Sequence, residues 1–495
     1  MKGTVPHIAV IGAGIGGLAA ALRLAHGGAR VTVLERHGSA GGKMRTLPTA
    51  AGPVDAGPTV LTLKTVFEDL FRDTGSALSD HVTLHRESVL ARHFWPDGTR
   101  LDLVADQAES TENVARVFGS GAAAEFTAFC AHTRTLFDAF DGPMMRSAAP
   151  SQGTLAARML RQPDLLHRME PRRSLAESLA HRFTEPKLRQ LFGRYATYVG
   201  GIPPTAPALL SLIWQAEAQG VWSVEGGMYA LARAIEARAA ELGARFHYGT
   251  HVSRIRVRDG RADAIVTDDA TVDADAVLFN GDPRALHAGY LGDDVRRAVA
   301  RKGVEPRSLS AMVHSFAAEA SGLPLAAHNV LFCADPDLEF GPLSRGEVPS
   351  DASLYICAQD RFGGQTPTGT ERFEIITNAP AVPDAATLTE KERQQWHATI
   401  MARLRRFGLM LSPGPAPETL TLPQNFAALF PASGGALYGR SPQGMMAAFH
   451  RPTVRSRIKG LYLTGGGVHP GAGVPMATRS AAHAAEAIMT DLSST

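Results

Sequence analysis

The sequence predicts an α/β fold in which a second domain, of α+β type, is inserted into a domain built on a parallel sheet. Three observations predict it. A strand–glycine turn–helix–strand unit opens the chain, a similar unit closes it from about residue 461, and a glycine turn with a helix and a small sheet lies between them. The 495 residues, 44% of them hydrophobic, provide enough core for two or three domains.

Charge and cysteine content exclude several classes of function. The 50 basic and 48 acidic residues nearly balance, whereas a dedicated nucleic-acid binder carries a strong basic excess, so no nucleic-acid partner is expected. The three cysteines, Cys130, Cys333 and Cys357, lie far apart in the sequence. We therefore expect neither a disulfide framework nor a thiolate metal site, and a reducing compartment fits best.

The opening unit has the spacing of a dinucleotide-binding motif. The apolar strand 7–11 leads into Gly12, Gly14 and Gly17, a helix follows, and a second strand ends on Glu35. Gly12 permits a tight turn, Gly14 lets a pyrophosphate approach the backbone, and Gly17 lets the helix pack on the strand. The helix N-terminus favours phosphates, and Glu35 is placed to accept hydrogen bonds from a ribose. We expect a Rossmann-like domain.

The residues after Glu35 distinguish flavin from nicotinamide dinucleotides. Gly41-Gly42-Lys43 and Arg45 follow shortly after it. This paired glycine resembles the extended flavin signature of the amine-oxidase and carotenoid-desaturase superfamily. The resemblance implies FAD as the cofactor, with the glycines beside its ribityl and phosphate groups and the two cations near its pyrophosphate. It extends to the next glycine turn, whose candidate cofactor-binding residues are Gly57, Pro58 and Thr59.

The C-terminal unit supports the same cofactor. A strand at 461–464, a glycine-rich turn and a helix from about Ala477 resemble the C-terminal signature of bacterial carotenoid desaturases, in which this segment lies along the isoalloxazine ring. Most of that family has Thr before His-Pro-Gly, whereas this chain has Val468, which favours the branch that acts on hydroxylated carotenoids. The residues implied at the flavin are Gly465, Gly466, Gly473, Val474, Pro475 and Met476.

The central segment completes the predicted flavin domain. Gly226-Gly227 precede an amphipathic helix, and strands with an Asp259-Gly260 hairpin turn follow. This order resembles the central flavin-binding segment of the family and implies that the backbone of Val252 meets the adenine. We therefore expect a discontinuous FAD-binding domain and a substrate-binding domain inserted in two pieces. The predicted boundaries are 1–62, 221–288 and 450–495 for the former, and 63–220 and 289–449 for the latter.

The segment 143–194 predicts contact with a membrane surface. Its arginines alternate with large apolar residues such as Met159, Leu160 and Leu166, the pattern of a helical lid lying among lipid headgroups. The longest apolar run, 8–22, is too short to span a bilayer, and we expect no signal peptide and no transmembrane helix. The predicted location is peripheral, on the cytoplasmic side of the membrane.

The resemblance implies a long apolar carotenoid substrate. Exposing a forty-carbon chain to water costs roughly 30 kcal/mol at about 0.8 kcal/mol per CH₂, so such an enzyme is expected to draw it from the bilayer. The implied reaction is FAD-dependent desaturation of an acyclic carotenoid, most closely formation of the C3–C4 double bond of a 1-hydroxycarotenoid, by hydride transfer to flavin and loss of a proton. A second glycine-rich run, 119–124, follows a predicted helix rather than a strand, so no nicotinamide site is expected, and oxygen or a membrane quinone is the predicted electron acceptor.

The candidate catalytic residues are Glu225 and His469, because both adjoin glycine turns that resemble flavin-contacting ones. Either is a candidate base or positioning group; the alternative is a hydrogen bond that shapes the turn. The arginine–aspartate pair suggested as acid and base in phytoene desaturases has no clear match, since the corresponding stretch here is LAARML. The candidate substrate residues are Tyr195 and Tyr198 as pocket walls and His328 and Asn329 as partners of a substrate hydroxyl.

Three other interpretations remain open. A phytoene desaturase differs from the leading interpretation mainly through Val468 and its neighbours. A flavin-free prenyl-lipid carrier similar to the GDP dissociation inhibitors shares a related fold, but the intact glycine and acid set argues against it. A soluble amine oxidase would be expected to have a C-terminal cysteine for flavin attachment or an aromatic cage, and the three cysteines offer no such attachment point.

Overall fold

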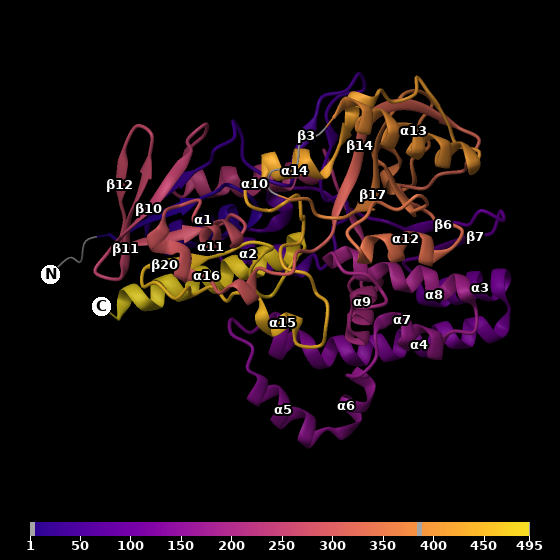
Figure 1. Cartoon of the computed structure of the whole chain (residues 1–495), viewed down its shortest axis with the longest axis horizontal. Helices are drawn as coiled ribbons and strands as arrows, with labels where there is room; N and C mark the ends of the chain where they lie inside the picture. Colours follow the sequence, from indigo (N-terminus) through magenta and orange to yellow (C-terminus); the bar gives the residue numbers. More distant parts are fainter. Residues whose placement is uncertain (1–4, 384–388, 495) are drawn as a thin grey trace.

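The computed structural model describes residues 5–383 and 389–494, and it contains two main sheets (Figure 1). The first is a five-stranded sheet with the order β20-β13-β1-β2-β9, in which every neighbouring pair is parallel. Its strands are β1 (His7–Ile11), β2 (Arg30–Leu34), β9 (Arg245–His247), β13 (Ala276–Phe279) and β20 (Leu461–Leu463). The sheet therefore joins three segments that are far apart in the sequence.

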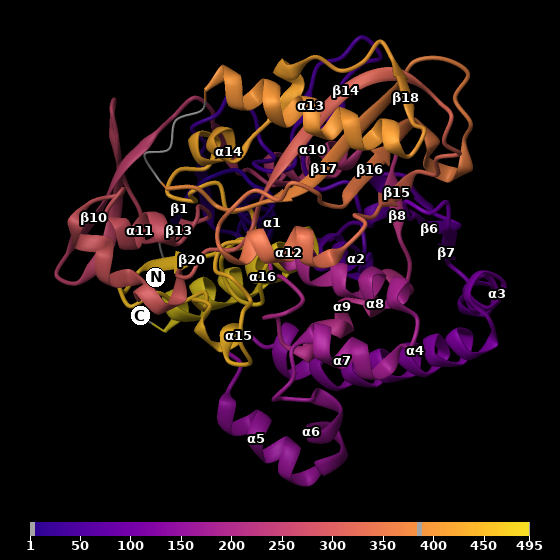
Figure 2. The same ribbon diagram turned by 45° about the vertical axis from the view of Figure 1, so that its right-hand side comes forward.

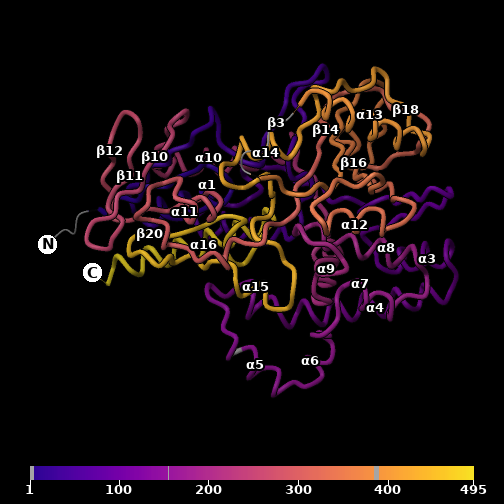
Figure 3. The backbone as a smooth tube through the Cα atoms, in the orientation of Figure 1, coloured from indigo at the N-terminus to yellow at the C-terminus, as the bar shows by residue number. Residues whose placement is uncertain are grey.

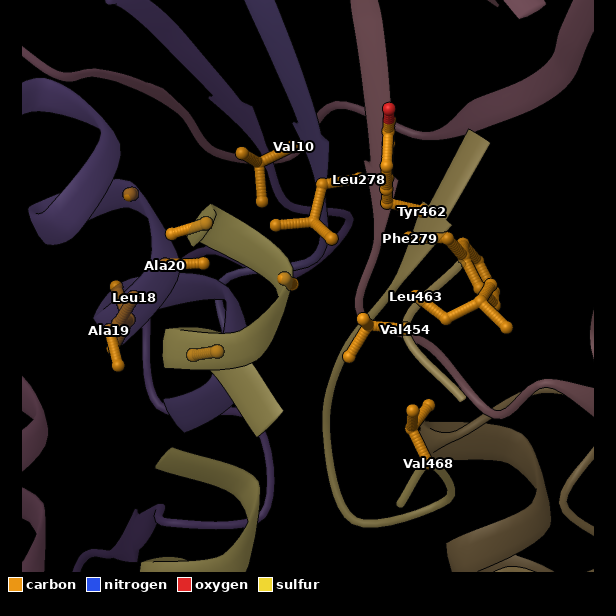
Figure 4. Close-up of a cluster of buried hydrophobic side chains, with 14 of the residues drawn as sticks. Val10, Leu18, Ala19, Ala20, Leu278, Phe279, Val454, Tyr462, Leu463 and Val468 are labelled. Carbon is orange, nitrogen blue, oxygen red and sulfur yellow. The ribbon is translucent and has the colours of Figure 1, made fainter. Parts of the chain in front are cut away.

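Helices cover this sheet closely. They are α1 (Ile15–His26), α2 (Thr65–Arg72), α10 (Met228–Glu241) and α16 (Val474–Ser493). Figure 4 shows Val10 and Leu278 of the sheet beside the alanine-rich helices α1 and α16, where Ala19 and Ala20 are fully buried. Small side chains permit this close approach, and the burial of the whole β1 strand explains its unbroken apolar sequence. The same core includes Phe67 and Phe71 of α2, beyond the predicted boundary at residue 62.

A three-stranded sheet extends the first domain at its edge. It contains β10 (Val252–Arg258), β11 (Arg261–Thr267) and β12 (Thr271–Asp273). Asp259 and Gly260 join β10 to β11 with φ values of 51° and 78°, as the hairpin pattern predicted. Short elements complete this half of the chain: β3 (Thr46–Leu47), β4 (Val54–Asp55), β5 (Leu84–Arg86), β8 (Trp222–Val224), α11 (Arg284–Ala288) and α15 (Ala447–His450).

The second main sheet has eight strands and lies beside the first domain (Figure 1). Its order is β18-β14-β17-β16-β15-β6-β7, and β19 pairs with β14. The bounds are β6 (Val89–Phe94), β7 (Arg100–Val104), β14 (Ser310–Ser321), β15 (His328–Leu331), β16 (Leu354–Ala358), β17 (Glu371–Ala379), β18 (Met410–Ser412) and β19 (Leu420–Thr421). Helix α13 (Glu390–Arg406) packs Ile400 and Leu404 on one face; α12 (Pro336–Ser344) and α14 (Pro423–Leu429) lie nearby.

A helical layer packs against the opposite face of the second sheet (Figure 2). It consists of α3 (Gln107–Phe118), α4 (Ser120–Phe140), α7 (Leu175–Arg182), α8 (Pro186–Gly193) and α9 (Ile213–Ala218). Phe129, Phe192 and Trp214 form its aromatic centre. Helix α8 continues into a 3₁₀ segment, Arg194–Val199, which ends at Gly200 with φ of 75°.

Two short helices project from this layer. Helices α5 (Gln152–Arg161) and α6 (Pro163–Met169) stand away from both sheets in each view, including the tube of Figure 3. Leu160 is 85% exposed and Leu166 is 43% exposed, whereas Leu165 is buried. Across the described residues, no helix has both the length and the apolar character needed to cross a bilayer.

Candidate flavin and substrate site

The first glycine turn joins the two ends of the chain. A Cβ on Gly17 would lie 2.1 Å from the carbonyl oxygen of Gly12, and one on Gly16 would lie 2.9 Å from Gly465 Cα. Gly465 belongs to the C-terminal turn, and its N–H donates to Ser480 Oγ of α16 at 2.8 Å. The two glycine-rich turns that sequence analysis assigned to the flavin therefore lie in direct contact.

Asn280, which directly follows β13, contacts both of these turns. Its Nδ2 donates to the carbonyl oxygens of Gly12 (3.0 Å) and Gly14 (3.2 Å). Its Oδ1 lies 2.8 Å from the position that a Cβ on Gly465 would occupy. The amide thus fixes the entry to α1 and restricts the C-terminal turn to glycine. Sequence analysis gave Asn280 no role.

Glu35 is buried at the end of β2, as predicted. Its carboxylate accepts backbone hydrogen bonds from Ala13 (2.8 Å) and His37 (2.9 Å). A carboxylate offers about four lone-pair sites, so two remain for a ribose. The Thr250 N–H donates to the Glu35 carbonyl oxygen, which brings the start of β10 and the buried Val252 to the same edge of the sheet.

The paired glycines, Gly41 and Gly42, pack against the first glycine turn. The Gly41 N–H donates to the Ala13 carbonyl oxygen at 2.8 Å, and a Cβ on Gly42 would lie 2.9 Å from Gly14 Cα. Lys43, predicted to lie near the pyrophosphate, donates through its Nζ to the Leu437 carbonyl oxygen at 2.5 Å. Lys43 is accessible, yet desolvation lowers its pKa to about 8. This combination indicates an interior position rather than the outer surface.

Arg45 and the following turn lie against the second domain. Arg45 is desolvated, lies over the Phe426 ring at 6.0 Å, and has a buried Nη2 without a hydrogen-bond partner. The tight turn at Gly57 places its α-carbon against the Lys43 carbonyl oxygen. Pro58 follows, and Thr59 Oγ1 lies 2.9 Å from the Tyr355 hydroxyl of β16. These residues therefore connect the predicted flavin region to the eight-stranded sheet.

The C-terminal turn ends directly at a helix N-terminus. Gly473, with φ of 108°, precedes α16, and the helix begins at Val474 rather than near Ala477 as predicted. Pro475 occupies an early position where its missing N–H is not needed, Val474 and Pro475 are buried, and Met476 is half-buried. Gly466 accepts a 2.9 Å hydrogen bond from Arg451, which holds this turn from the preceding segment.

These features fit a dinucleotide. Helix α1 has no acidic residue in its first turn and no side-chain cap on its first N–H groups, so they remain available to an anion. Gly14 leaves the approach to those groups without a side chain, and the unpartnered Nη2 of Arg45 adds a donor. The residues positioned to hold a flavin dinucleotide are those of the first turn, Glu35, the 41–45 and 57–59 turns, Val252 and the 465–476 segment.

The two candidate catalytic residues have different environments. Glu225 is 68% exposed at its side chain and pairs with His85 at 3.4 Å, so it lacks the burial of a proton acceptor in a closed site. His469 is buried, and burial lowers its pKa; its Nε2 lies 2.9 Å from the Ser147 carbonyl oxygen. The neutral imidazole thus shapes the C-terminal turn by donating to that carbonyl.

Tyr195 and Tyr198 belong to a polar cluster inside the helical layer. The Tyr195 hydroxyl donates to Glu217 at 2.6 Å, and Arg194 Nη1 donates to the Tyr198 hydroxyl at 3.0 Å. Burial raises the pKa of both tyrosines, which keeps their hydroxyls protonated. Arg194 and Glu217 were not among the predicted site residues, because single charges within an apolar segment resemble solvated surface positions in sequence.

His328 and Asn329 lie next to each other on β15 but have separate environments. His328 Nδ1 lies 2.8 Å from the Tyr355 hydroxyl, its Nε2 is buried without a partner, and burial lowers its pKa to about 4. Asn329 bonds through its amide to the Ala326 backbone and to the Ile356 carbonyl oxygen. The structure therefore gives Asn329 a local structural role and leaves His328 as the polar group near Tyr355.

Sequence reasoning also missed Asp55 as a positioning residue. Its carboxylate accepts hydrogen bonds from the backbone N–H groups of Met228 (2.6 Å) and Tyr229 (3.2 Å) at the start of α10. Burial raises its pKa, and the two hydrogen bonds oppose that shift. The sequence contains both parts of this contact. Asp55 is an acid just before the 57–59 turn, and Gly226-Gly227 precede helix α10, which Asp55 caps.

The chain is similar to known proteins over almost its whole length. Residues 15–489 match the model of a family described as flavin containing amine oxidoreductase. A hydroxyneurosporene desaturase of Cereibacter sphaeroides is 51% identical over 495 residues, covering 100% of this chain and 99% of that protein. Proteins of the same name from Rhodobacter capsulatus (46%; 98% of each chain) and Rubrivivax gelatinosus (43%; 99% of this chain and 94% of that protein) are also similar.

Solved structures share the fold at low sequence identity. An oxidoreductase from Methanosarcina mazei has a TM-score of 0.60 and 17% identity, covering 98% of this chain and 100% of that one. Cyclohexylamine oxidase from Brevibacterium oxydans has a TM-score of 0.59 and 17% identity, covering 99% and 100%. These similarities confirm the predicted α/β fold class.

Proposed function

Because the chain belongs to the family of flavin-containing amine oxidoreductases, we propose that it desaturates an acyclic 1-hydroxycarotenoid of the hydroxyneurosporene type at C3–C4. Membership confirms the predicted oxidoreductase class and the flavin cofactor, FAD. The observation that carries the substrate is the full-length similarity to three hydroxyneurosporene desaturases. The intact first turn and Glu35 support a dinucleotide-binding enzyme rather than a flavin-free carrier.

In this reaction the residues of the chain bind and orient the substrate and exclude water from its reacting carbons. FAD, when bound, accepts a hydride from carbon. A substrate cation next to a polyene is acidic, so its C3 proton needs only a weak acceptor, and no triad is required. The aromatic cluster of Phe192, Tyr195 and Trp214 excludes water from the helical layer. His469 holds the C-terminal turn in position through its contact with the Ser147 carbonyl.

Anaerobic flavin reduction tests the proposal. The FAD-loaded protein is mixed with liposomes containing either 1-hydroxyneurosporene or phytoene, and flavin bleaching is followed together with the red shift of the polyene. Bleaching by the hydroxylated carotenoid alone is expected. Bleaching by phytoene alone would identify a phytoene desaturase instead, and bleaching by neither would reject a carotenoid substrate. Reoxidation with oxygen or a quinone analogue then tests the proposed acceptors.

Membrane contact through α5 and α6 is part of the same proposal. Leu160 is 85% exposed between Arg158 and Arg161, and α6 exposes Leu166. Apolar side chains flanked by cations match an interface with anionic lipid headgroups. A substrate that cannot leave the bilayer at low cost requires the enzyme to reach it there.

Liposome co-sedimentation measures this contact. We expect Leu160→Glu to weaken binding to anionic vesicles by about tenfold, since it removes an inserting side chain and adds a like charge to the lipid. Leu338→Glu is the matched control, because Leu338 is 47% exposed but lies on α12, away from α5 and α6 (Figure 1). Equal effects of both substitutions would exclude α5 as the contact.

A further inference from the structure

A charged group lies inside the aromatic layer of a protein whose proposed substrate is a hydrocarbon. Arg194, Tyr195 and Tyr198 come from the 3₁₀ segment after α8, and Glu217 comes from α9. Arg194 Nη1 donates to the Tyr198 hydroxyl, and the Tyr195 hydroxyl donates to Glu217. Burying such a group costs free energy unless it is paired, so its presence requires an explanation.

The cluster lies beside the predicted flavin region. The Arg194 guanidinium stacks over the Tyr198 ring at 5.1 Å and over the Tyr355 ring at 5.5 Å. Tyr355 in turn contacts Thr59 through its hydroxyl. A continuous series of contacts therefore connects Arg194 to the 57–59 turn, one of the segments predicted to lie at the flavin.

Arg194 also retains free donors. Burial opposes its charge, but Tyr198 and Glu217 outweigh burial and the pKa of Arg194 is raised, so the guanidinium stays protonated. A guanidinium carries five N–H donors, and Tyr198 uses one of them here. Arg194 and Tyr198 are both half-buried rather than fully buried, although desolvation is the largest influence on each, so both border accessible space in the interior.

We propose that Arg194 and Tyr198 bind the oxygen on C1 of the substrate and select hydroxylated over unhydroxylated carotenoids. The inference rests on the proposed function and assigns the residues behind its substrate preference. In a 1-hydroxycarotenoid a single carbon separates C1 from C3, so the oxygen must lie close to the reacting carbons. Arg194 donates to that oxygen, and the Tyr198 hydroxyl oxygen is placed to accept from it.

Selectivity arises because an unhydroxylated substrate leaves the donors of the Arg194 guanidinium without a hydrogen-bond partner. A carotenoid that ends in plain hydrocarbon would cover the guanidinium without offering an acceptor. Sites built to bond a substrate hydroxyl reject the analogue that lacks it by large factors for this reason. The two aromatic rings stack on the guanidinium, and the nearby Glu217 carboxylate favours its charge, before the substrate arrives, which limits the ordering required on binding.

The test compares 1-hydroxyneurosporene with neurosporene, its unhydroxylated counterpart, on the FAD-loaded protein in liposomes. For Arg194→Leu and Tyr198→Phe, we measure kcat/KM for anaerobic flavin reduction and the Kd of each carotenoid from its absorbance shift. Arg194→Leu should lower kcat/KM for 1-hydroxyneurosporene by about 100-fold and leave neurosporene within about threefold, because only the hydrogen bond to the charged group is lost. Tyr198→Phe should lower the ratio of kcat/KM for 1-hydroxyneurosporene to kcat/KM for neurosporene by about tenfold.

Arg189→Leu serves as the matched control, because Arg189 donates to the backbone carbonyls of Phe183 and Thr184 and is absent from the cluster. The Arg189→Leu variant should prefer 1-hydroxyneurosporene over neurosporene by the same factor as the wild type. If Arg194→Leu retains flavin, melts normally and keeps the preference, the inference is wrong while the proposed function stands. An equal loss for both carotenoids in Arg194→Leu and Tyr198→Phe would also overturn it. If the wild-type protein reacts with neither carotenoid, the proposed function itself fails.

Discussion

Asp55 caps helix α10 across a separation of 173 residues, with its Oδ2 accepting a 2.6 Å hydrogen bond from the Met228 N–H. Asp55 ends β4, which lies between the flavin-type turn and the eight-stranded sheet. A Cβ on Gly227 would lie 2.4 Å from the same carboxylate oxygen. One carboxylate thus connects the first and central segments of the discontinuous domain.

Removing this cap should destabilise the protein. For Asp55→Ala we expect the free energy of unfolding to fall by about 1–2 kcal/mol, because a helix loses the acceptor for its first N–H groups. Asp55→Asn retains an acceptor and should lose less than half as much. Denaturant titration of the FAD-loaded protein measures both. Equal losses would show that the negative charge, rather than the capping geometry, provides the stability.

The contact between Gly17 and the Gly12 carbonyl should control flavin retention. A Cβ at 2.1 Å from that oxygen forces the start of α1 away from β1, so Gly17→Ala is expected to purify with little or no flavin. Gly38→Ala is the control, since a Cβ there meets no atom within 4 Å. The ratio of flavin to protein absorbance gives the result. Full flavin content in Gly17→Ala would contradict the assignment of this turn to the cofactor.

The buried carboxyl group of Glu374, on β17, is expected to lower the protein's free energy of unfolding. It is fully buried, neither carboxyl oxygen has a hydrogen-bond partner, and desolvation raises its pKa well above the usual range. Replacing an unsatisfied buried polar group by an apolar one of similar size is neutral or favourable, and Glu374→Leu should stabilise the protein by about 1 kcal/mol.

Glu374→Gln keeps a buried polar group and should give no such gain. Both variants are compared by denaturant titration at pH 7. A loss of more than about 1 kcal/mol in Glu374→Leu would mean that the carboxyl has a partner in the FAD-loaded protein.

Three buried histidines predict acid sensitivity. Burial lowers the pKa of His93 and His314 to about 3 and that of His328 to about 4. In the unfolded chain each binds a proton below about pH 6.5. The native state does not bind these protons until much lower pH, so their contribution to stability is complete above pH 6.5 and falls as the pH decreases toward 4.

The expected slope for three protons is up to about 4 kcal/mol per pH unit. Denaturant titrations at pH 7, 6 and 5 measure it. His93→Phe should reduce the slope by up to about 1.4 kcal/mol per pH unit, the contribution of one proton, since that ring already stacks on Phe332 and an apolar ring fits there. An unchanged slope would mean that His93 is protonated in the native protein.

The first and last units of the fold were predictable because their signals are local. The β1 strand, the Gly12 turn and the Glu35 acid occur within one short stretch, and each residue type follows from backbone geometry. The Asp259-Gly260 turn was predictable for the same reason. Helix α16 begins three residues earlier than predicted because Pro475, which suggested a turn, instead occupies an N-terminal helical position that tolerates proline.

The candidate site was less predictable because its contacts are not local. Glu225 adjoins a glycine pair, but that pair faces Asp55 while the Glu225 side chain points to the exposed His85. Lys43 bonds Leu437, 394 residues away, a contact that no local pattern indicates. Arg194 and Glu217 lie in an apolar segment whose sequence gives no sign that the two residues belong to one buried cluster.

The contact between Gly16 and Gly465 affects how the protein must be made. A ribosome releases residues 1–62 long before it releases the C-terminal turn, yet the first turn packs on Gly465 and the sheet is completed by β20. The nascent chain therefore exposes an unfinished sheet edge until synthesis is nearly complete, while the inserted domain is already outside the ribosome. Cofactor loading is consequently expected only after β20 and the 465–476 segment have been made, and a deletion that reaches back to this segment should abolish it.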